Sequence, residues 1–268
     1  MAGRKRQLRK NKLLIARHYA IILRMQNDKS LYLSIVIPAY DEEENISSTL
    51  QDIAQYLKTK NYSYEVIVVD DGSKDKTAES AAYEGKIFPS FTLLRHSPNR
   101  GKGYTVKEGV LTAKGNLILF MDADNSTRIN QIDKLISAIL ENNDIAIGSR
   151  RIEGSTIEKY QPPHRRFMCN MYIKLSSLIL NTNINDYNCG FKLYKKEAAK
   201  KLFEKLTSDD WSFDSELIFL ASKLNLKIKE VPVTWQDKRK TSKVKPIRDG
   251  IKSFTSLIKI RAQKRDLS

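Results

Sequence analysis

Two aspartates, Asp122 and Asp124, are separated by one small residue and follow directly on the apolar run 117–121. Carboxylate oxygens are hard ligands that suit Mg2+ or Mn2+, and such a site is commonly completed by phosphate groups of the substrate. If the chain stays extended here, its side chains alternate and both carboxylates point the same way. The same residues would also form an ordinary acidic turn after a strand. The pair alone therefore leaves a metal site and a solvated turn equally open.

The apolar pattern predicts the elements that position these aspartates. Residues 117–121 are apolar throughout, which is typical of a strand buried on both faces of a sheet. Similar runs predict strands at 33–40, 64–69, 91–95 and 145–150, and helical spacing predicts helices at 46–57, 74–83, 102–113 and 132–140. This alternation favours an α/β fold with a mostly parallel sheet covered by helices on both faces. Ligands of such sheets bind beyond the carboxyl ends of the strands, where Asp122 and Asp124 stand.

Further charged residues follow other predicted strands at the same edge. Glu42 follows the first strand, Asp70 and Asp71 end the second, and Lys102 follows the third. The acids are suited to hold a metal ion and the base and ribose of a nucleotide, and Lys102 is suited to its phosphates. No Gly-x-Gly-x-x-Gly follows the first strand, and residues 101–103 do not complete a P-loop. The pattern indicates a nucleotide site that is not of the dinucleotide-binding type.

Four short motifs make the interpretation specific. Ile-Pro-Ala-Tyr-Asp-Glu-Glu at 37–43, Val-Asp-Asp-Gly-Ser at 69–73, Asn-Arg-Gly-Lys-Gly at 99–103 and Asp-Ala-Asp at 122–124 resemble the GT-A fold glycosyltransferases of family 2. The resemblance implies that Asp71 contacts the nucleobase and that the Asp-x-Asp binds a metal on the diphosphate of a nucleotide sugar. It implies a nucleotide-sugar site formed by Pro38, Ala39, Tyr40, Glu42, Asp71, Lys102, Asp122, Ala123 and Asp124.

The second half narrows the resemblance. The stretches 186–194, 211–217, 230–235 and 241–243 resemble the dolichyl-phosphate glucosyltransferases, and they match dolichyl-phosphate mannose synthases slightly less well. This implies UDP-glucose as the favoured donor, with GDP-mannose as its main rival, and a polyprenyl phosphate as the acceptor. The Gln-x-x-Arg-Trp motif of processive polysaccharide synthases is absent from the sequence. The relatives usually begin with a transmembrane helix, whereas this chain has a short basic segment in that place.

The acceptor decides which residues carry the chemistry. A phosphate monoester has its second pKa at about 6, so a polyprenyl phosphate is ionised near neutrality and needs cations more than a base. The candidates for binding this phosphate are Arg150, Arg151, Lys192, Lys243 and Arg248. A neutral hydroxyl acceptor would instead need a carboxylate base, for which Asp186 or Glu216 is available. The predicted catalytic set is therefore Asp124, Asp186, Glu216 and Lys243, and direct displacement at the anomeric carbon predicts inversion.

The charge of the chain lies at its two ends. The net charge is +16, with +8 in residues 1–30 and +8 in residues 237–268, while residues 31–236 hold 27 basic and 27 acidic residues. We therefore divide the chain into a basic N-terminal segment that could form an interfacial helix (1–30), a glycosyltransferase domain (31–236), and a basic loop with an amphipathic helix (237–268). Basic amphipathic ends favour an anionic membrane surface. The prediction is a peripheral protein on the cytosolic face of a membrane.

Other function classes fit less well. A sugar-1-phosphate nucleotidyltransferase would need a Gly-rich loop with Arg and Lys after the first strand, where this chain has Pro38, Ala39 and Tyr40. Nucleic acid is an unlikely partner because the body of the protein is neutral and lacks a basic, aromatic face. Cys169 and Cys189 lack metal-site spacing and predict reduced thiols, with Cys189 buried. Trp211 and Trp235 could stack on a sugar or a nucleobase, but packing in the core is the favoured prediction.

Overall fold

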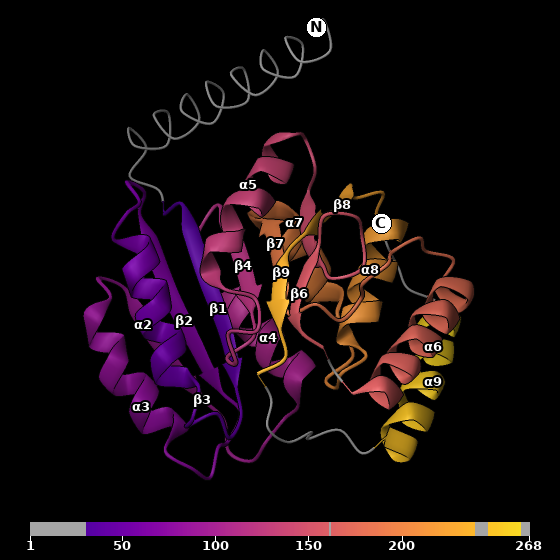
Figure 1. The fold of residues 1–268 in the computed structure, drawn as a ribbon, viewed down its shortest axis with the longest axis horizontal. Coiled ribbons are helices and arrows are strands. Elements are labelled where there is room, and N and C mark those ends of the chain that lie inside the picture. Colours follow the sequence, from indigo (N-terminus) through magenta and orange to yellow (C-terminus); the bar gives the residue numbers. More distant parts are fainter. Residues whose placement is uncertain (1–30, 161, 239–245, 264–268) are drawn as a thin grey trace, which may run out of the picture.

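A seven-stranded, mostly parallel sheet forms the centre of the molecule (Figure 1). The computed structural model describes residues 31–160, 162–238 and 246–263, and for residues 164 and 246–253 it describes the backbone. The strands are β1 (Leu33–Ala39), β2 (Tyr64–Asp70), β3 (Phe91–Arg95), β4 (Leu117–Met121), β5 (Ile145–Ser149), β7 (Phe191–Lys195) and β8 (Ile228–Pro232). Their order is β3-β2-β1-β4-β7-β5-β8, and β7 alone in this sheet runs antiparallel to its neighbours. The five strands and the α/β class predicted from the sequence are confirmed.

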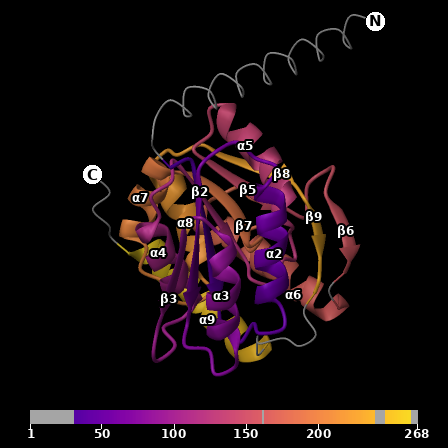
Figure 2. The ribbon, with the colours of Figure 1, turned by 90° about the vertical axis from the view of Figure 1, so that its left-hand side faces the viewer.

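Helices cover both faces of this sheet, as Figures 1 and 2 show from two directions. One face packs on α2 (Ile46–Leu57), α3 (Thr77–Glu84) and α5 (Ile132–Leu140), and the other on α4 (Lys102–Thr112), α7 (Lys196–Lys205) and α8 (Phe213–Lys223). Short 3-10 turns precede β3 at η1 (Gly85–Ile87) and α5 at η2 (Ile129–Gln131). All the predicted helices of the first half are present.

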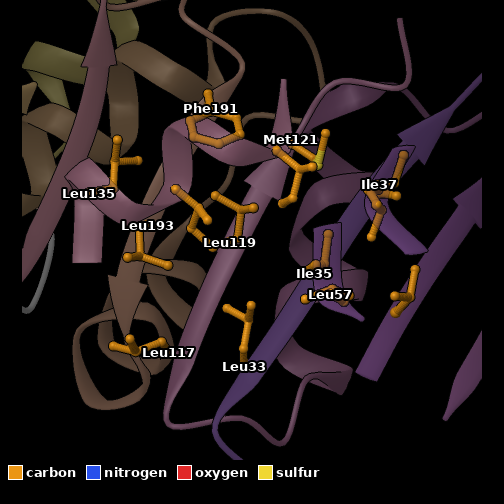
Figure 3. Close-up of a cluster of buried hydrophobic side chains, with 14 of the residues drawn as sticks. Leu33, Ile35, Ile37, Leu57, Leu117, Leu119, Met121, Leu135, Phe191 and Leu193 are labelled. Carbon is orange, nitrogen blue, oxygen red and sulfur yellow. The ribbon is translucent and has the colours of Figure 1, made fainter. Parts of the chain in front are cut away.

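Strand β4 shows why continuous apolar runs mark central strands. Leu119 and Met121 face the cluster beneath α2 and α5, which Figure 3 shows, while Ile118 and Phe120 face the cluster beneath α4 and α8. All five residues of β4 are buried. A strand with helices on both faces has no solvent-facing side, so its alternating positions are all apolar.

Two further pairs of elements, one of strands and one of helices, complete the fold. Strands β6 (Thr156–Lys159) and β9 (Thr234–Gln236) pair in parallel, and α6 (Pro163–Leu180) packs against α9 (Pro246–Ala262) through Leu180, Leu257 and Ile260. Figure 1 shows α6 and α9 side by side at the edge of the molecule. Among the described residues, no helix combines the length and the apolar character needed to cross a bilayer.

Candidate functional site

The Asp-x-Asp motif lies in a tight turn immediately beyond β4. The extended chain predicted here is wrong, because β4 ends at Met121 and Asn125 has a left-handed φ of 52°. The Asn125 amide donates to the Asp122 carbonyl, and the Ser126 amide donates to Oδ1 of Asp124 at 2.9 Å. A Cβ at Gly190 would lie 2.0 Å from Oδ2 of Asp122, so only glycine lets this carboxylate pack against the backbone before β7. The turn thus presents both aspartates at the carboxyl end of β4, and both side chains are partly exposed.

A cluster of alternating charges surrounds Asp122. Lys102 Nζ lies 2.6 Å from Oδ1 of Asp122, and buried Lys192 pairs with buried Asp214 beneath it. Burial lowers the pKa of Lys102, but the negative charges of Asp122, Asp214 and Asp124 outweigh burial, so its pKa lies above the ordinary value. Burial raises the pKa of Asp214, and the nearby charges of Lys192 and Lys102 offset this only in part. We call these five residues, Lys102, Asp122, Asp124, Lys192 and Asp214, the charge cluster.

Asp214 is the member of this cluster that the sequence analysis missed. It lies in the 211–217 stretch, from which Glu216 was selected as a possible base. On α8, residues two positions apart point in different directions, so only one of the two carboxylates faces the site. The structure places Asp214 there and turns Glu216 into the protein. Lys192, a basic residue in the buried part of strand β7, was the signal for a buried acidic partner.

Glu216 holds a loop in place. Its side chain is fully buried, and its carboxylate accepts hydrogen bonds from the Thr207 amide and hydroxyl and from the Ser208 amide, at 2.8–3.0 Å. The loop then contacts the start of α4, where the Gly103 amide donates to the Asp209 carbonyl at 2.7 Å. Contact between Glu216 and an acceptor hydroxyl would require these bonds to break. The structure therefore gives no support to Glu216 as a base. Glu216 instead holds in place the loop that borders Lys102.

The loop from Asn99 to Gly101 is organised by Asp71. This carboxylate is 3% exposed and accepts hydrogen bonds from the Arg100 amide at 2.8 Å and the Gly101 amide at 2.9 Å. His96 Nδ1 contacts the same carboxylate at 3.1 Å, and its Nε2 contacts Glu108. Gly101 has a φ of 99°, and a Cβ there would lie 2.4 Å from the Asp209 carbonyl. Asp71 thus fixes the turn that delivers Lys102, and its predicted contact with a nucleobase stays a prediction.

The predicted base-and-ribose segment lies beside the Asp71 turn. Pro38 and Ala39 are buried, and Tyr40 and Glu42 are partly exposed. Asp41 adopts a left-handed φ of 50°. Two hydroxyl groups that follow β2 hold this segment: the Ser73 hydroxyl accepts a hydrogen bond from the Asp41 amide, and the Thr77 hydroxyl accepts one from the Glu42 amide. Ala123 is also buried, and its carbonyl accepts a hydrogen bond from Thr49 at 2.8 Å. The ends of β1, β2 and β4 therefore meet at one edge, as the sequence predicts.

Arg150 and Asp186 form a closed ion pair. Asp186 is fully buried, and its carboxylate accepts two guanidinium hydrogen bonds, at 2.6 and 2.7 Å, and one from the Arg150 amide at 3.0 Å. Burial by itself raises the pKa of Asp186, but Arg150 outweighs burial and holds it below its ordinary value. Asp186 therefore has no exposed surface with which to act as a base, and its geometry is that of a structural residue.

The predicted phosphate-binding cations have different environments. Arg151 is exposed and donates to Asn170, whereas Lys192 is 1% exposed and engaged by Asp214. Contact between Lys192 and an acceptor phosphate would require that pair to open, and the Arg150 guanidinium is committed to Asp186. Lys243 and the side chain of Arg248 lie outside the described part of the chain. Of the described members of this set, Arg151 is the one that the structure leaves exposed.

Two further predictions concerned tryptophan and cysteine. Trp235 is buried, with the Arg150 guanidinium 5.1 Å from its ring, but Trp211 is 48% exposed, so its predicted place in the core is wrong. The Trp211 ring lies 4.8 Å from Lys102 Nζ, beside the charge cluster. Cys189 is buried, as predicted, and burial raises the pKa of its thiol to about 12, which disfavours a thiolate nucleophile. Cys169 and Cys189 are both free thiols.

The charge cluster fits a divalent cation. Among the residues that the structure describes, no group of three or more His, Cys, Asp or Glu side chains is placed to hold a metal ion. Asp122 and Asp124 could supply two carboxylate ligands, and Mg2+ in proteins is commonly held by one or two carboxylates together with waters and substrate phosphates. Asp122 already accepts a cation in the form of the Lys102 ammonium group, which shows that its carboxylate is accessible to positive charge.

Comparison with known proteins identifies the family. The model of glycosyl transferase family 2 matches residues 34–203. The chain belongs to this family. The match spans the three strand ends, strand β7 and every member of the charge cluster except Asp214. The resemblance inferred from the four motifs is confirmed, and the protein is a glycosyltransferase.

Curated relatives cover most of the chain. A dolichyl-phosphate beta-glucosyltransferase of Dictyostelium discoideum is 35% identical over 245 residues, which are 87% of this chain and 74% of the relative. The enzyme of the same name from Saccharomyces cerevisiae is 34% identical over 258 residues, which are 88% of this chain and 76% of the relative.

Solved structures share the fold. Glucosyl-3-phosphoglycerate synthase from Mycobacterium tuberculosis, in complex with Mn2+, uridine diphosphate and glucosyl-3-phosphoglycerate, matches with a TM-score of 0.64 at 17% identity, covering 88% of this chain and 82% of that one. Mannosyl-3-phosphoglycerate synthase from Rubrobacter xylanophilus matches with a TM-score of 0.65 at 18% identity, covering 87% and 73%. These likenesses establish the GT-A fold.

Proposed function

We propose that this protein is an inverting glycosyltransferase that moves glucose from UDP-glucose onto dolichyl phosphate or a similar polyprenyl phosphate. The observation that carries the proposal is the identity of about a third to relatives of that name across 87–88% of the chain, which includes the charge cluster. Within this cluster, Asp122 and Asp124 would hold Mg2+ or Mn2+, and Asp71 with the 38–42 segment would contact the base and ribose.

The donor site follows from the charges that bond cleavage creates. When the anomeric C–O bond breaks, its electron pair goes to the diphosphate oxygen, and the leaving group is UDP. A divalent ion held by Asp122 and Asp124 would stabilise this charge as a Lewis acid. Lys102, which starts α4 beside Asp122, supplies a further positive charge to the diphosphate. Fixed charges of this kind act where negative charge develops and need no reorganisation during the reaction.

Residues from the second half of the chain would bind the acceptor. An oxygen of the polyprenyl phosphate forms the new bond to the anomeric carbon as the bond to UDP breaks, which inverts that carbon. An ionised phosphate needs no base, which agrees with the burial of both predicted bases, Asp186 and Glu216. Exposed Arg151 supports the acceptor phosphate, since the guanidinium fork matches phosphate oxygens.

The paired helices α6 and α9 support a membrane-surface location. Their exposed apolar side chains are Phe167, Met171 and Leu178 on α6 and Phe254 and Ile258 on α9, between 42% and 79% exposed. Exposed Lys174, Lys259 and Arg261 lie among them. Positions 167, 171 and 178 share one helix face, and an apolar face with basic neighbours suits the surface of an anionic bilayer. A peripheral position on the cytosolic face would bring the site to a lipid-borne phosphate.

One incubation series tests the reaction. The protein is supplied with radiolabelled UDP-glucose or GDP-mannose, a polyprenyl phosphate, and Mg2+ or Mn2+. We expect an organic-extractable, mild-acid-labile glucosyl lipid with UDP-glucose, and its loss in excess chelator and in Asp124→Ala. Product from GDP-mannose alone would replace the donor assignment, and no lipid product with either donor would overturn the proposal.

A vesicle experiment tests the location. We expect the protein to sediment with vesicles that contain phosphatidylserine, and a Phe167→Ser, Leu178→Ser double variant to sediment less. Tyr83→Ser is the matched control, because Tyr83 is 70% exposed on the distant helix α3. Equal sedimentation of the wild type and the double variant would contradict the role of this surface.

A further inference from the structure

Lys102 and the proposed metal ion would compete for the same carboxylate, that of Asp122. Its ammonium group lies 2.6 Å from Asp122 Oδ1, on one of the two carboxylates that the proposed function assigns to a metal ion. The same group lies 4.8 Å from the centre of the Trp211 ring and 5.5 Å from that of Phe120. A lysine ammonium and a divalent cation repel each other at such close range, so both cannot rest against Asp122 at full strength.

The backbone of Lys102 is held while its side chain is not. The preceding turn is bonded to the Asp71 carboxylate through the Arg100 and Gly101 amides, and the following amide, Gly103, donates to Asp209. The side chain is 20% exposed and ends in a single ion pair to a carboxylate that is itself 31% exposed. A four-carbon stem on a fixed Cα lets the ammonium group swing without any movement of α4.

The other members of the charge cluster show which charges remain when Lys102 leaves. Lys192 neutralises Asp214 in a pair that has almost no exposed surface. Departure of Lys102 from Asp122 would therefore leave the Asp122 carboxylate open to another cation, and the proposed function supplies a divalent metal ion there. The displaced ammonium then needs a new anion, and a nucleotide diphosphate bound to that cation is one.

We propose that Lys102 exchanges partners, from Asp122 to the donor diphosphate, and so makes metal binding and nucleotide binding depend on each other. The inference rests on the proposed function, because it takes Asp122 as a metal ligand and a nucleotide diphosphate as the donor group. Without nucleotide, a metal ion must displace Lys102 from Asp122 with no new partner for the ammonium. With nucleotide, the displaced ammonium pairs with the diphosphate. By linkage, the nucleotide tightens the metal and the metal tightens the nucleotide by the same factor.

The exchange predicts two opposite effects when Lys102 is neutralised: Mn2+ binding without UDP becomes tighter, and the gain in Mn2+ affinity that UDP provides becomes smaller. Lys102→Met keeps the length of the stem and removes the charge. We expect it to bind Mn2+ alone about 10-fold more tightly than the wild type, because nothing competes for Asp122. We expect the factor by which UDP tightens Mn2+ to fall about 10-fold or more, because the diphosphate loses its lysine. Lys102→Arg, which keeps the charge, should behave like the wild type in Mn2+ binding without UDP.

The measurement is a titration of Mn2+ into the full-length protein, with and without UDP, in which free Mn2+ is followed by electron paramagnetic resonance. Lys114→Met is the matched control, since it removes the same charge at an exposed position beyond the end of α4. Lys102→Gln repeats the test with a polar side chain, and thermal unfolding confirms that each variant is folded. Asp122→Asn tests the metal site itself.

The outcomes separate the exchange from the proposed function. Unchanged or weaker binding of Mn2+ alone in both Lys102→Met and Lys102→Gln overturns the exchange, provided that Asp122→Asn abolishes UDP-dependent binding. If Asp122→Asn leaves Mn2+ binding in the presence of UDP unchanged, the donor site itself is wrong and the exchange falls with it. An equal gain in Lys114→Met would reduce the effect to general charge and would also overturn the exchange.

Discussion

Two ion pairs of this molecule, Lys102–Asp122 and Arg150–Asp186, have the same shortest N–O distance of 2.6 Å and opposite characters. The lysine pair is one bond between side chains that are 20% and 31% exposed. In the arginine pair the side chains are 14% and 0% exposed, and the carboxylate accepts three hydrogen bonds from the same residue. Both pairs lie next to a tryptophan, exposed Trp211 for the first and buried Trp235 for the second.

The difference separates a pair that can exchange from a pair that cannot. A guanidinium fork that engages both oxygens of a buried carboxylate leaves neither partner a second option, and breaking such a pair strands a charge. A single lysine contact at a partly exposed carboxylate costs little to open, because solvent or another ion replaces it. We therefore assign Arg150–Asp186 to the architecture and Lys102–Asp122 to the chemistry. Substitutions in the two pairs and their neighbours should therefore differ in their effects on stability and on activity.

Breaking the buried pair should cost the most. Arg150→Met leaves the Asp186 carboxylate buried and unpaired, and we expect the free energy of unfolding to fall by about 3–5 kcal/mol in urea denaturation. Asp186→Leu combined with Arg150→Met should recover part of this loss, because neither charge remains buried. A loss below about 1 kcal/mol in Arg150→Met would show that the pair behaves like a surface salt bridge.

The same pair predicts a pH dependence with a definite sign. The folded pKa of Asp186 lies below its unfolded value because Arg150 outweighs burial. Its stabilisation is therefore present above the unfolded pKa of about 3.9 and is lost as the pH falls through the folded pKa. We expect wild-type stability to decline below pH of about 4 and this part of the decline to be absent in the Arg150→Met, Asp186→Leu variant, as measured by urea midpoints from neutral to acidic pH.

Neutralising the Asp-x-Asp should remove activity and leave stability intact. We expect Asp122→Asn and Asp124→Asn each to lower kcat by about 100- to 1,000-fold, since each removes a group that stabilises charge in the transition state. The urea midpoints should stay near that of the wild type, because both side chains are partly exposed. Exposed Glu141→Gln, at the end of α5, is the control and should retain activity. A folded Asp124→Asn enzyme with near wild-type kcat would remove the metal role.

Substitutions of two carboxylates on α8 should affect different properties, activity for Asp214 and stability for Glu216. Asp214→Asn keeps the shape of the side chain next to Lys102 and Lys192, and we expect about a 10-fold lower kcat with a smaller change in stability. Glu216→Gln replaces acceptors of three hydrogen bonds and should cost about 1–3 kcal/mol of stability, with activity lost only in proportion to loosening of the 207–209 loop. Matched kinetics and unfolding curves decide the assignment. The reverse pattern would make Glu216 the residue at the site.

Opening the lysine pair should have the smallest effect on stability. We expect Lys102→Met to change the free energy of unfolding by less than about 1 kcal/mol, because the pair is part-exposed and bonded once. The comparison with Arg150→Met uses the same substitution type and the same denaturant. Equal losses in the two variants would contradict the division of the two pairs.

The sequence predicted the strands and helices of the first half of the chain closely, because the signals there are local. Apolar runs such as 117–121 specify central strands by themselves, and parallel strands place their ends at one edge. Glu42, Asp71 and Asp122 were therefore assigned to one edge, and β1, β2 and β4 bring those ends together. The local geometry of the Asp-x-Asp was wrong, because a turn with a left-handed Asn125 follows β4. A few residues of extended chain and a tight turn are not distinguished by the pattern Asp-Ala-Asp.

The second half was harder because its signals are long-range. Strand β7 enters antiparallel between β4 and β5, so neighbours in space come from distant parts of the chain. This insertion places Gly190 against Asp122 and Lys192 against Asp214. The choice of Asp186 and Glu216 as bases rested on residue type and on loop or helix position. Neither reveals that Arg150, or the amides of residues 207 and 208, already use those carboxylates.

Short-range apolar patterns and contiguous motifs encode the element order, the edge at which the acids gather and the family, so these could be predicted from the sequence. Which charged groups pair with each other follows from the folded structure alone. That choice depends on partners 20 to 36 residues apart, as in Lys102–Asp122 and Arg150–Asp186, and on how much water each pair retains. Burial and a bidentate fork close one pair into the architecture. Partial exposure and a single bond leave the other able to exchange partners.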